Sequence, residues 1–284
     1  MTQSVAEKLK NGVGLREPVR VVSDLHLGHR ATRVEEVGQL VPLLDGVGTL
    51  VCAGDTWEEI AGEFAGRGAA MLEELRGLAA ERGVRLVLLP GNHDPGAPGP
   101  GFVELAGGAV FVTHGHMLFR DGAPWSRMLP ERRTEVERVW REAGGEAESL
   151  DGRLRVANDV ARVLVAPDDL KGRSAISRIW DAAVPPARAW RMLQAWRRFP
   201  GEAARMAACF RPEARVVVVG HFHRAGVWRR GGRRVVNTGS FMPPGAAWCV
   251  DVEAGRVAVR KIRRGAVGCF EPGRVRTIHS EGSE

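Results

Sequence analysis

The sequence of 284 residues has no long apolar run and only four cysteines. No segment approaches the ~20 consecutive apolar residues that span a bilayer. The first eight residues, MTQSVAEK, lack the apolar core of a secretion signal. The cysteines form no Cys-x-x-Cys pair, and Cys52 and Cys249 lie in apolar runs, which favours buried reduced thiols. These absences argue against a membrane-spanning helix and a disulfide framework, and we expect a cytoplasmic protein.

Charge is distributed unevenly along the chain. The formal net charge of +7 divides into −5 over residues 1–119, +5 over residues 120–215 and +7 over residues 216–284. The acidic first part can supply carboxylates to a metal, whereas the basic remainder favours an anionic partner. An arginine-rich genome would give the same composition without any partner, so both interpretations stay open.

Short apolar runs that end at polar motifs predict a layered α/β protein. The runs are residues 19–23, 49–53, 84–89, 109–113 and 216–219. Continuous apolar runs of this length fit strands that are buried on both faces. Residues 69–82 have helical spacing between two of them. The chain closes with two predicted hairpins, over residues 227–237 and 246–262.

A region rich in tryptophan and arginine interrupts this order of strands. Its helical periodicity includes five of the eight tryptophans, Trp125, Trp140, Trp180, Trp190 and Trp196. Thr134 and Glu137 predict a capping box at the start of one helix. Pro186 predicts the start of another, whose apolar stripe is flanked by arginines. We predict a single domain over residues 1–284, with a helical cap inserted at residues 120–212.

Five polar motifs hold six of the eight histidines. They are SDLHLG at residues 23–28, AGDTWEE at 53–59, PGNHD at 90–94, THGH at 113–116 and GHFH at 220–223. Because each follows a predicted strand, we expect them to meet at the carboxyl edge of a sheet. Carboxylates, imidazoles and one amide are the donors that two adjacent divalent cations need. Such a site implies hydrolysis, most often at phosphorus.

In their residues and their order, the five motifs resemble those of the calcineurin-like metallophosphoesterase superfamily. The resemblance covers residues 19–119 and 216–240 and leaves the cap outside it. It implies an α/β fold, a four-layer sandwich of two β-sheets flanked by helices. It also implies hydrolysis of a phosphoester or pyrophosphate bond by hydroxide bound to two divalent metal ions. Nitrogen and oxygen donors without thiolates suit manganese, our first choice, or iron or zinc.

The resemblance assigns a role to each motif residue. The implied metal ligands are Asp24, His26 and His223 for the first ion, Asn92, His114 and His221 for the second, and Asp55 as the bridge. His93 resembles the family's non-ligand histidine, which assists the leaving group, and Glu58 is its predicted orienter. The alternative for Glu58 is a solvated residue at a helix start. His116 either touches substrate or supports a ligand. Arg224 either binds a second phosphate or is solvated surface.

Several substrate classes stay open. The first two motifs and a helical insertion after THGH also resemble bacterial UDP-2,3-diacylglucosamine hydrolases, which are peripheral membrane enzymes. That family typically has arginine where this chain has His93. The likeness implies an anionic lipid-linked or nucleotide substrate and membrane contact through the cap, with ordinary packing of the tryptophans as the alternative. The basic second half also fits a DNA or RNA nuclease. A non-catalytic scaffold is a further alternative, which the complete ligand set disfavours. No protein partner is evident.

Overall fold

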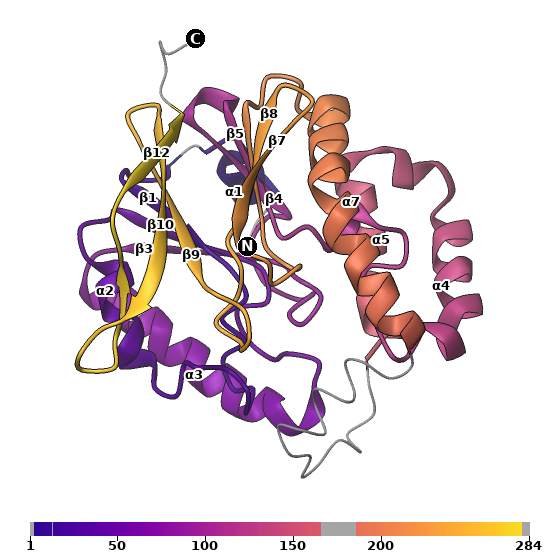
Figure 1. Ribbon diagram of the computed structural model, residues 1–284, viewed down its shortest axis with the longest axis horizontal. Helices are drawn as coiled ribbons and strands as arrows, with labels where there is room; N and C mark the ends of the chain where they lie inside the picture. Colours follow the sequence, from indigo (N-terminus) through magenta and orange to yellow (C-terminus); the bar gives the residue numbers. More distant parts are fainter. Residues whose placement is uncertain (1–2, 13, 166–185, 280–284) are drawn as a thin grey trace.

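Two β-sheets lie face to face at the centre of the protein, and helices cover their outer faces (Figure 1). The computed structural model describes residues 3–12, 14–165 and 186–279. The first sheet contains β1 (Val19–Val22), β2 (Thr49–Ala53), β3 (Arg85–Leu89), β9 (Trp248–Glu253), β10 (Arg256–Arg264), β11 (Phe270–Pro272) and β12 (Arg276–His279). Its order is β11-β10-β9-β1-β2-β3, and β12 pairs with β10.

The second sheet and the helices complete the sandwich. This sheet contains β4 (Phe102–Leu105), β5 (Val110–Thr113), β6 (Val216–Val219), β7 (Gly226–Arg230) and β8 (Arg233–Asn237), in the order β4-β5-β6-β8-β7. The α-helices are α1 (Gln3–Lys10), α2 (Val41–Leu44), α3 (Gly62–Glu81), α4 (Leu129–Ala143), α5 (Leu150–Val163) and α7 (Pro186–Phe210). Short 3-10 helices are η1 (Val37–Leu40), η2 (Ala106–Gly108), η3 (His116–Leu118) and η4 (Gly144–Glu148).

The valine-rich strands are buried on both faces because each sheet lies between two layers. In β1, Val21 packs between the sheets, whereas its neighbour Val22 packs under α3. The next strand repeats the alternation, with Val51 between the sheets and Cys52 on the helix side. Neither face meets water, so both can be apolar and the sequence shows continuous runs. The predicted sandwich of two sheets flanked by helices is confirmed.

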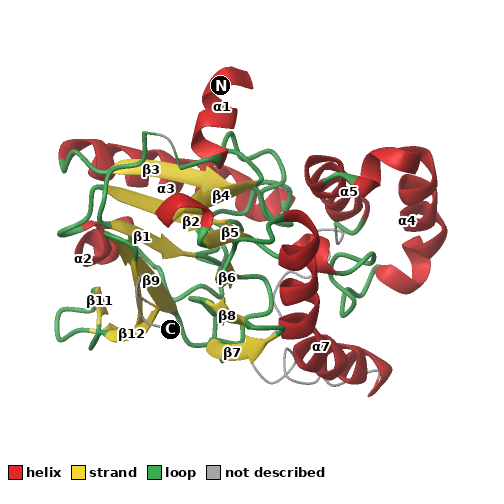
Figure 2. Cartoon of the chain, turned by 90° about the horizontal axis from the view of Figure 1, so that it is seen from above, coloured by secondary structure: helices red, strands yellow, loops and turns green. Residues whose placement is uncertain are grey.

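The helices that cover the two outer faces come from different parts of the chain: α3 lies between β2 and β3, whereas α5 and α7 lie between β5 and β6. The stripe predicted within residues 69–82 does face the first sheet, although α3 begins earlier, at Gly62. The second sheet is covered by α5 and α7, with Leu154 and Phe199 in the shared core. Figure 2 shows α4 farther out, and it packs on α5 through Trp140 and Val160. The helices α5 and α7 therefore form the outer layer over the second sheet, and α4 lies outside α5.

The predicted capping box at Thr134 and Glu137 is wrong. The helix begins at Leu129 with a proline in its first turn, and Thr134 lies inside it. Proline fixes a helical φ at the start without needing a side-chain cap. The other predicted helix start, at residues 185–186, lies at the edge of the described residues, where α7 is helical from Pro186 and continues through Pro200. The stripe around Trp180 lies outside the described residues, and the boundaries 120–212 stay a prediction.

All four cysteines are free, and the two in apolar runs, Cys52 and Cys249, are buried as predicted. Burial raises the pKa of both thiols to about 12, so they stay protonated.

None of the described helices is both long and apolar enough to cross a membrane.

Arg20 and Asp251 form a buried ion pair across β1 and β9. Arg20 is 5% exposed, and its Nε and Nη2 donate to the two carboxylate oxygens at 2.7 and 3.1 Å. We expect Asp251→Ala to lower the free energy of unfolding by about 3–5 kcal/mol, because it leaves a buried guanidinium without its carboxylate. Urea unfolding measures the loss. Glu142→Ala, in an exposed pair with Arg138, is the control and should cost at most about 1 kcal/mol. Equal losses in the two variants would contradict the expectation.

Candidate metal centre

Each of the five motifs begins where a buried strand ends. In the first sheet β1, β2 and β3 run parallel, and in the second β5 and β6 run parallel. The loops after these strands therefore emerge at the same edge of each sheet. Hydrogen bonds join the loops across the two sheets, as when the backbone N–H of His221 donates to both Asp24 carboxylate oxygens at 3.1 Å. The motifs thus meet at one edge of the sandwich, as predicted.

Sharp backbone turns aim the motif side chains at a common space. Five of the seven non-glycine residues with positive φ among the described residues belong to the predicted ligand set. They are Asp24 (54°), His26 (49°), Asp55 (50°), His221 (66°) and His223 (50°). This conformation is unfavourable for residues with a Cβ and persists only where the surrounding structure holds it. Its concentration here marks a site that the fold maintains at a cost in stability.

The first group of donors consists of Asp24, His26, Asp55 and His223, whose ligand atoms all lie within 4.8 Å of one another. The Nε2 atoms of His26 and His223 are 3.3 Å apart. His26 Nε2 is also 3.8 Å from Asp55 Oδ2, and His223 Nε2 is 3.1 Å from Asp24 Oδ1. Two imidazoles and two carboxylates therefore surround one small volume.

The second group shares Asp55 with the first and adds His114 and His221. His114 Nε2 lies 3.3 Å from Asp55 Oδ2 and 3.2 Å from Asn92 Oδ1. One carboxylate thus belongs to two overlapping donor groups, which is the arrangement that a bridging ligand needs. The structure brings all seven residues of the predicted ligand set together.

Hydrogen bonds outside the cluster fix the orientation of three imidazoles. His114 Nδ1 donates to Ala53 O at 2.9 Å, and His26 Nδ1 donates to Glu58 Oε1 at 2.8 Å. His221 Nε2 donates to Gly122 O at 3.2 Å. In each ring the other nitrogen is left to accept a proton or a cation, as in metal-binding histidines generally.

The electrostatics of the cluster fit bound cations. Burial would raise the pKa of Asp55, but the charges of His114 and His93 hold it well below its usual value. Burial would lower the pKa of His114, but the Asp55 carboxylate outweighs it and raises that pKa to about 9. The carboxylates therefore require positive charge among them. A divalent cation supplies that charge when it displaces the proton.

Glu58 is buried between two histidines and is not the solvated helix-start residue of the alternative interpretation. Its carboxylate, 1% exposed, accepts from Nδ1 of His26 and Nδ1 of His93, each at 2.8 Å. Burial opposes protonation of His93, but Glu58 and then Asp55 raise its pKa to about 10. The His93 side chain is 38% exposed, and its Nε2 is the nitrogen that Glu58 does not bind. The structure thus pairs these two residues as the sequence predicted.

The two candidate substrate contacts, His116 and Arg224, lie in different surroundings. His116 is fully buried, and its Nε2 donates to Asn158 Oδ1 at 2.9 Å. Burial and then the charge of His114 lower its pKa to about 4, so the ring is neutral. Arg224 is exposed and donates to the backbone oxygen of Trp196 at 3.2 Å. The geometry supports a structural role for His116, whereas phosphate binding by the exposed Arg224 stays a prediction.

Three supporting contacts could not be assigned from the sequence. Ser23 Oγ donates to the Asp24 carboxylate and lies 2.5 Å from Thr238 Oγ1. Its place in the SDLHLG motif is the only signal that could have pointed to it. Gly122 and Asn158 belong to the helical region, and no motif marks either of them.

The chain matches the calcineurin-like phosphoesterase family over residues 17–225. The protein therefore belongs to this family, and the resemblance of the five motifs is confirmed. No curated protein matches the chain.

Several solved structures are similar to the chain. Vps29 from Chaetomium thermophilum is 12% identical, with 92% of this chain and 97% of that chain covered and a TM-score of 0.44. A dimetal phosphatase from Danio rerio is 10% identical, with 93% and 100% covered and a TM-score of 0.42. A predicted phosphoesterase from Streptococcus pneumoniae TIGR4 is 15% identical, with 93% and 98% covered and a TM-score of 0.37.

Proposed function

We propose that the protein is a metal-dependent phosphoesterase that hydrolyses a phosphoester or pyrophosphate bond with two divalent cations. One observation supports this most strongly: two groups of donor atoms from separate loops overlap at the single carboxylate of Asp55. Family membership makes hydrolase activity the expected function. Manganese is our first candidate for the cations, because the set contains nitrogen and oxygen donors and no thiolate.

The ligand set divides between two cation positions. Asp24, His26 and His223 would hold one cation, Asn92, His114 and His221 the other, and Asp55 both. When bound, the pair supplies Lewis acidity, which polarises phosphoryl oxygens and makes a water molecule acidic enough to react near neutral pH.

His93 would protonate the leaving group. Glu58 holds Nδ1 of the ring, which leaves Nε2 to donate to the departing oxygen. Because Glu58 and then Asp55 outweigh the effect of burial and raise the pKa of His93 to about 10, the ring carries its proton at neutral pH. The same carboxylate also binds His26, so one residue orients both the proton donor and a metal ligand.

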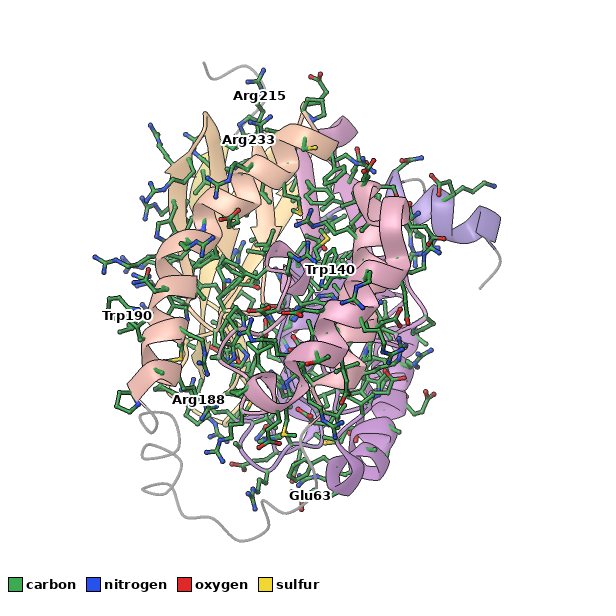
Figure 3. The ribbon with its side chains drawn as sticks, turned by 90° about the vertical axis from the view of Figure 1, so that its right-hand side faces the viewer. Glu63, Trp140, Arg188, Trp190, Arg215 and Arg233 are labelled. Carbon is green, nitrogen blue, oxygen red and sulfur yellow. The ribbon has the colours of Figure 1, made fainter. Side chains whose placement is uncertain are left out.

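A lipid-linked substrate, with contact between the cap and a membrane, is a second proposal that one observation favours. Trp190 and Leu193 lie one helical turn apart on α7 and are 58% and 45% exposed. Figure 3 shows Trp190 projecting away from the helix, whose polar positions include several arginines. Exposed tryptophan and leucine beside arginine suit a membrane interface. Farther along α7, Phe199 of the same stripe is fully buried, so ordinary packing on the core accounts for that part of the stripe.

A substrate panel tests these proposals. It contains an aryl phosphodiester, an acylated UDP-sugar, a cyclic nucleotide and single-stranded DNA, each with Mn²⁺ or chelator and with or without anionic vesicles. We expect Mn²⁺-dependent hydrolysis of the aryl phosphodiester. Preference for the acylated substrate, enhanced by vesicles and lost in Trp190→Ala, would support the lipid proposal, whereas faster cleavage of DNA would support a nuclease. Absence of hydrolysis from every member would overturn the function and favour a scaffold.

A further inference from the structure

In its described part, residues 120–165 and 186–212, the helical region between β5 and β6 contacts the second donor group of the candidate metal centre. Its hydrogen bonds and ring contacts reach the imidazoles of the second donor group, His114 and His221, directly or through one intervening residue. Within the described ranges, no such contact joins this region to Asp24, His26 or His223. The two cation positions therefore have different surroundings.

The direct contacts are made to His221 by the segment 122–125. Gly122 O accepts the hydrogen bond from His221 Nε2 at 3.2 Å. The Trp125 ring packs against the imidazole, with centroids 5.0 Å apart and planes inclined at 38°. The carbonyl group selects the tautomer and the indole limits rotation of the ring. Together they leave Nδ1 as the nitrogen available to a cation.

The indirect contact runs through His116. Its ring centroid lies 5.3 Å from that of His114 and 6.3 Å from that of His221, so it packs against both second-group imidazoles. Asn158 on α5 accepts from His116 Nε2 at 2.9 Å and holds the ring from the other side. Because His116 is fully buried, a change in its orientation would have to displace its neighbours.

The last helix of the region fixes the segment 122–125. Arg188 Nε donates to Trp125 O at 2.7 Å, and Arg191 Nε donates to Pro124 O at 2.8 Å. Trp196 Nε1 on the same helix donates to Phe222 O at 2.9 Å, beside His221 in the chain. Two arginines that flank the predicted stripe thus bind backbone carbonyls next to a ligand loop.

We infer that the described part of the helical region sets the second cation position, with Asn158 and Trp125 as positioning residues, whereas the first position does not depend on these two residues. This inference rests on the proposed two-metal function. Supporting residues behind metal ligands typically change metal affinity by about 10- to 100-fold. We therefore expect that replacing Asn158 or Trp125 lowers the affinity for the second ion selectively.

The experiment measures Mn²⁺ binding to the full chain by calorimetry, with electron paramagnetic resonance to detect spin-coupled ion pairs. Wild type should bind two ions and show the coupled signal. Asn158→Leu and Trp125→Ala should lower the affinity for the second Mn²⁺ ion by about 10- to 100-fold and leave the affinity for the first unchanged. At intermediate Mn²⁺ concentrations, these variants should show the spectrum of a single isolated ion.

Two matched variants separate positioning from general damage to the helices. Asn158→Asp keeps an oxygen that can accept from His116 and should restore binding of the second ion. Trp140→Phe removes a hydrogen bond of 2.8 Å to Arg120 O in the same region, away from the ligand rings, and should bind both ions as wild type does.

The outcomes that contradict the inference differ from those that contradict the proposed function. Unchanged affinity for the second ion in both Asn158→Leu and Trp125→Ala would overturn the inference. An equal loss of affinity for both Mn²⁺ ions would also overturn the inference, because the predicted difference between the two positions would be absent. A wild-type chain that binds fewer than two Mn²⁺ ions would instead overturn the two-metal function, before any variant is examined.

Discussion

Asp55→Asn is expected to abolish metal-dependent hydrolysis while leaving the fold intact. Asp55 Oδ2 lies 3.3 Å from His114 Nε2 and 3.8 Å from His26 Nε2, so it is the atom that the two donor groups share. Asparagine keeps the shape of the side chain but removes the charge that offsets repulsion between two cations. A loss of about 4 kcal/mol in transition-state stabilisation corresponds to a fall in kcat of about a thousandfold.

The fold should survive this substitution because asparagine can replace the structural contact of the carboxylate. Asp55 Oδ1 accepts from the backbone N–H of His93 at 2.8 Å, and an amide oxygen can accept the same bond. Hydrolysis of an aryl phosphodiester and the circular dichroism spectrum are the paired measurements. Asp151→Asn, at an exposed carboxylate paired with Lys10, is the control and should keep full activity. Full activity in Asp55→Asn would contradict the bridging role.

The second large effect is expected at His93. Removal of a general acid typically lowers the rate by about 10²- to 10⁴-fold, and we expect this fall in kcat for His93→Gln. Mn²⁺ affinity should stay the same, because His93 is not one of the seven predicted ligands. Steady-state kinetics and calorimetry on the same sample measure the two quantities. A large loss of Mn²⁺ affinity would instead make His93 a ligand.

Glu58→Gln provides the corresponding pH test. Burial opposes protonation of His93, but Glu58 and then Asp55 raise its pKa to about 10, so the protonated ring persists below that pH and is lost as the pH rises through it. Without the charge, the pKa should fall toward the ordinary value of about 6.5. The alkaline limb of the kcat profile should therefore move to lower pH by about one unit or more. An unmoved limb would contradict the role of Glu58.

The strands that lead to the site could be predicted closely, but β4, β11 and β12 could not. The bounds of β2 and β6 agree with the apolar runs that predict them, because both faces of these strands are buried. In contrast, β12 contains one buried apolar residue, Ile278, and among the described strands it pairs only with β10. A short charged strand that pairs on one side has neither a continuous nor an alternating apolar pattern.

The same distinction applies within the site. The donors after each strand were predictable because short motifs carry them at fixed places in the sequence. Their supports were not, because Gly122 and Asn158 lie 99 and 42 residues from the histidines they bind, His221 and His116. Those contacts depend on how the inserted helices dock. Trp190 is exposed and Phe199 is buried because of the same docking. The apolar stripe in the sequence contains both residues and does not distinguish them.

The central claim is that two cations centred on Asp55 are required for hydrolysis. The most direct measurement is the rate of aryl phosphodiester hydrolysis by metal-free wild-type protein as Mn²⁺ is added back. We predict no rate above the buffer background without metal, and a rate that appears as the second equivalent of Mn²⁺ binds. Full activity in the chelated protein, or none in the protein loaded with two ions, would contradict the claim.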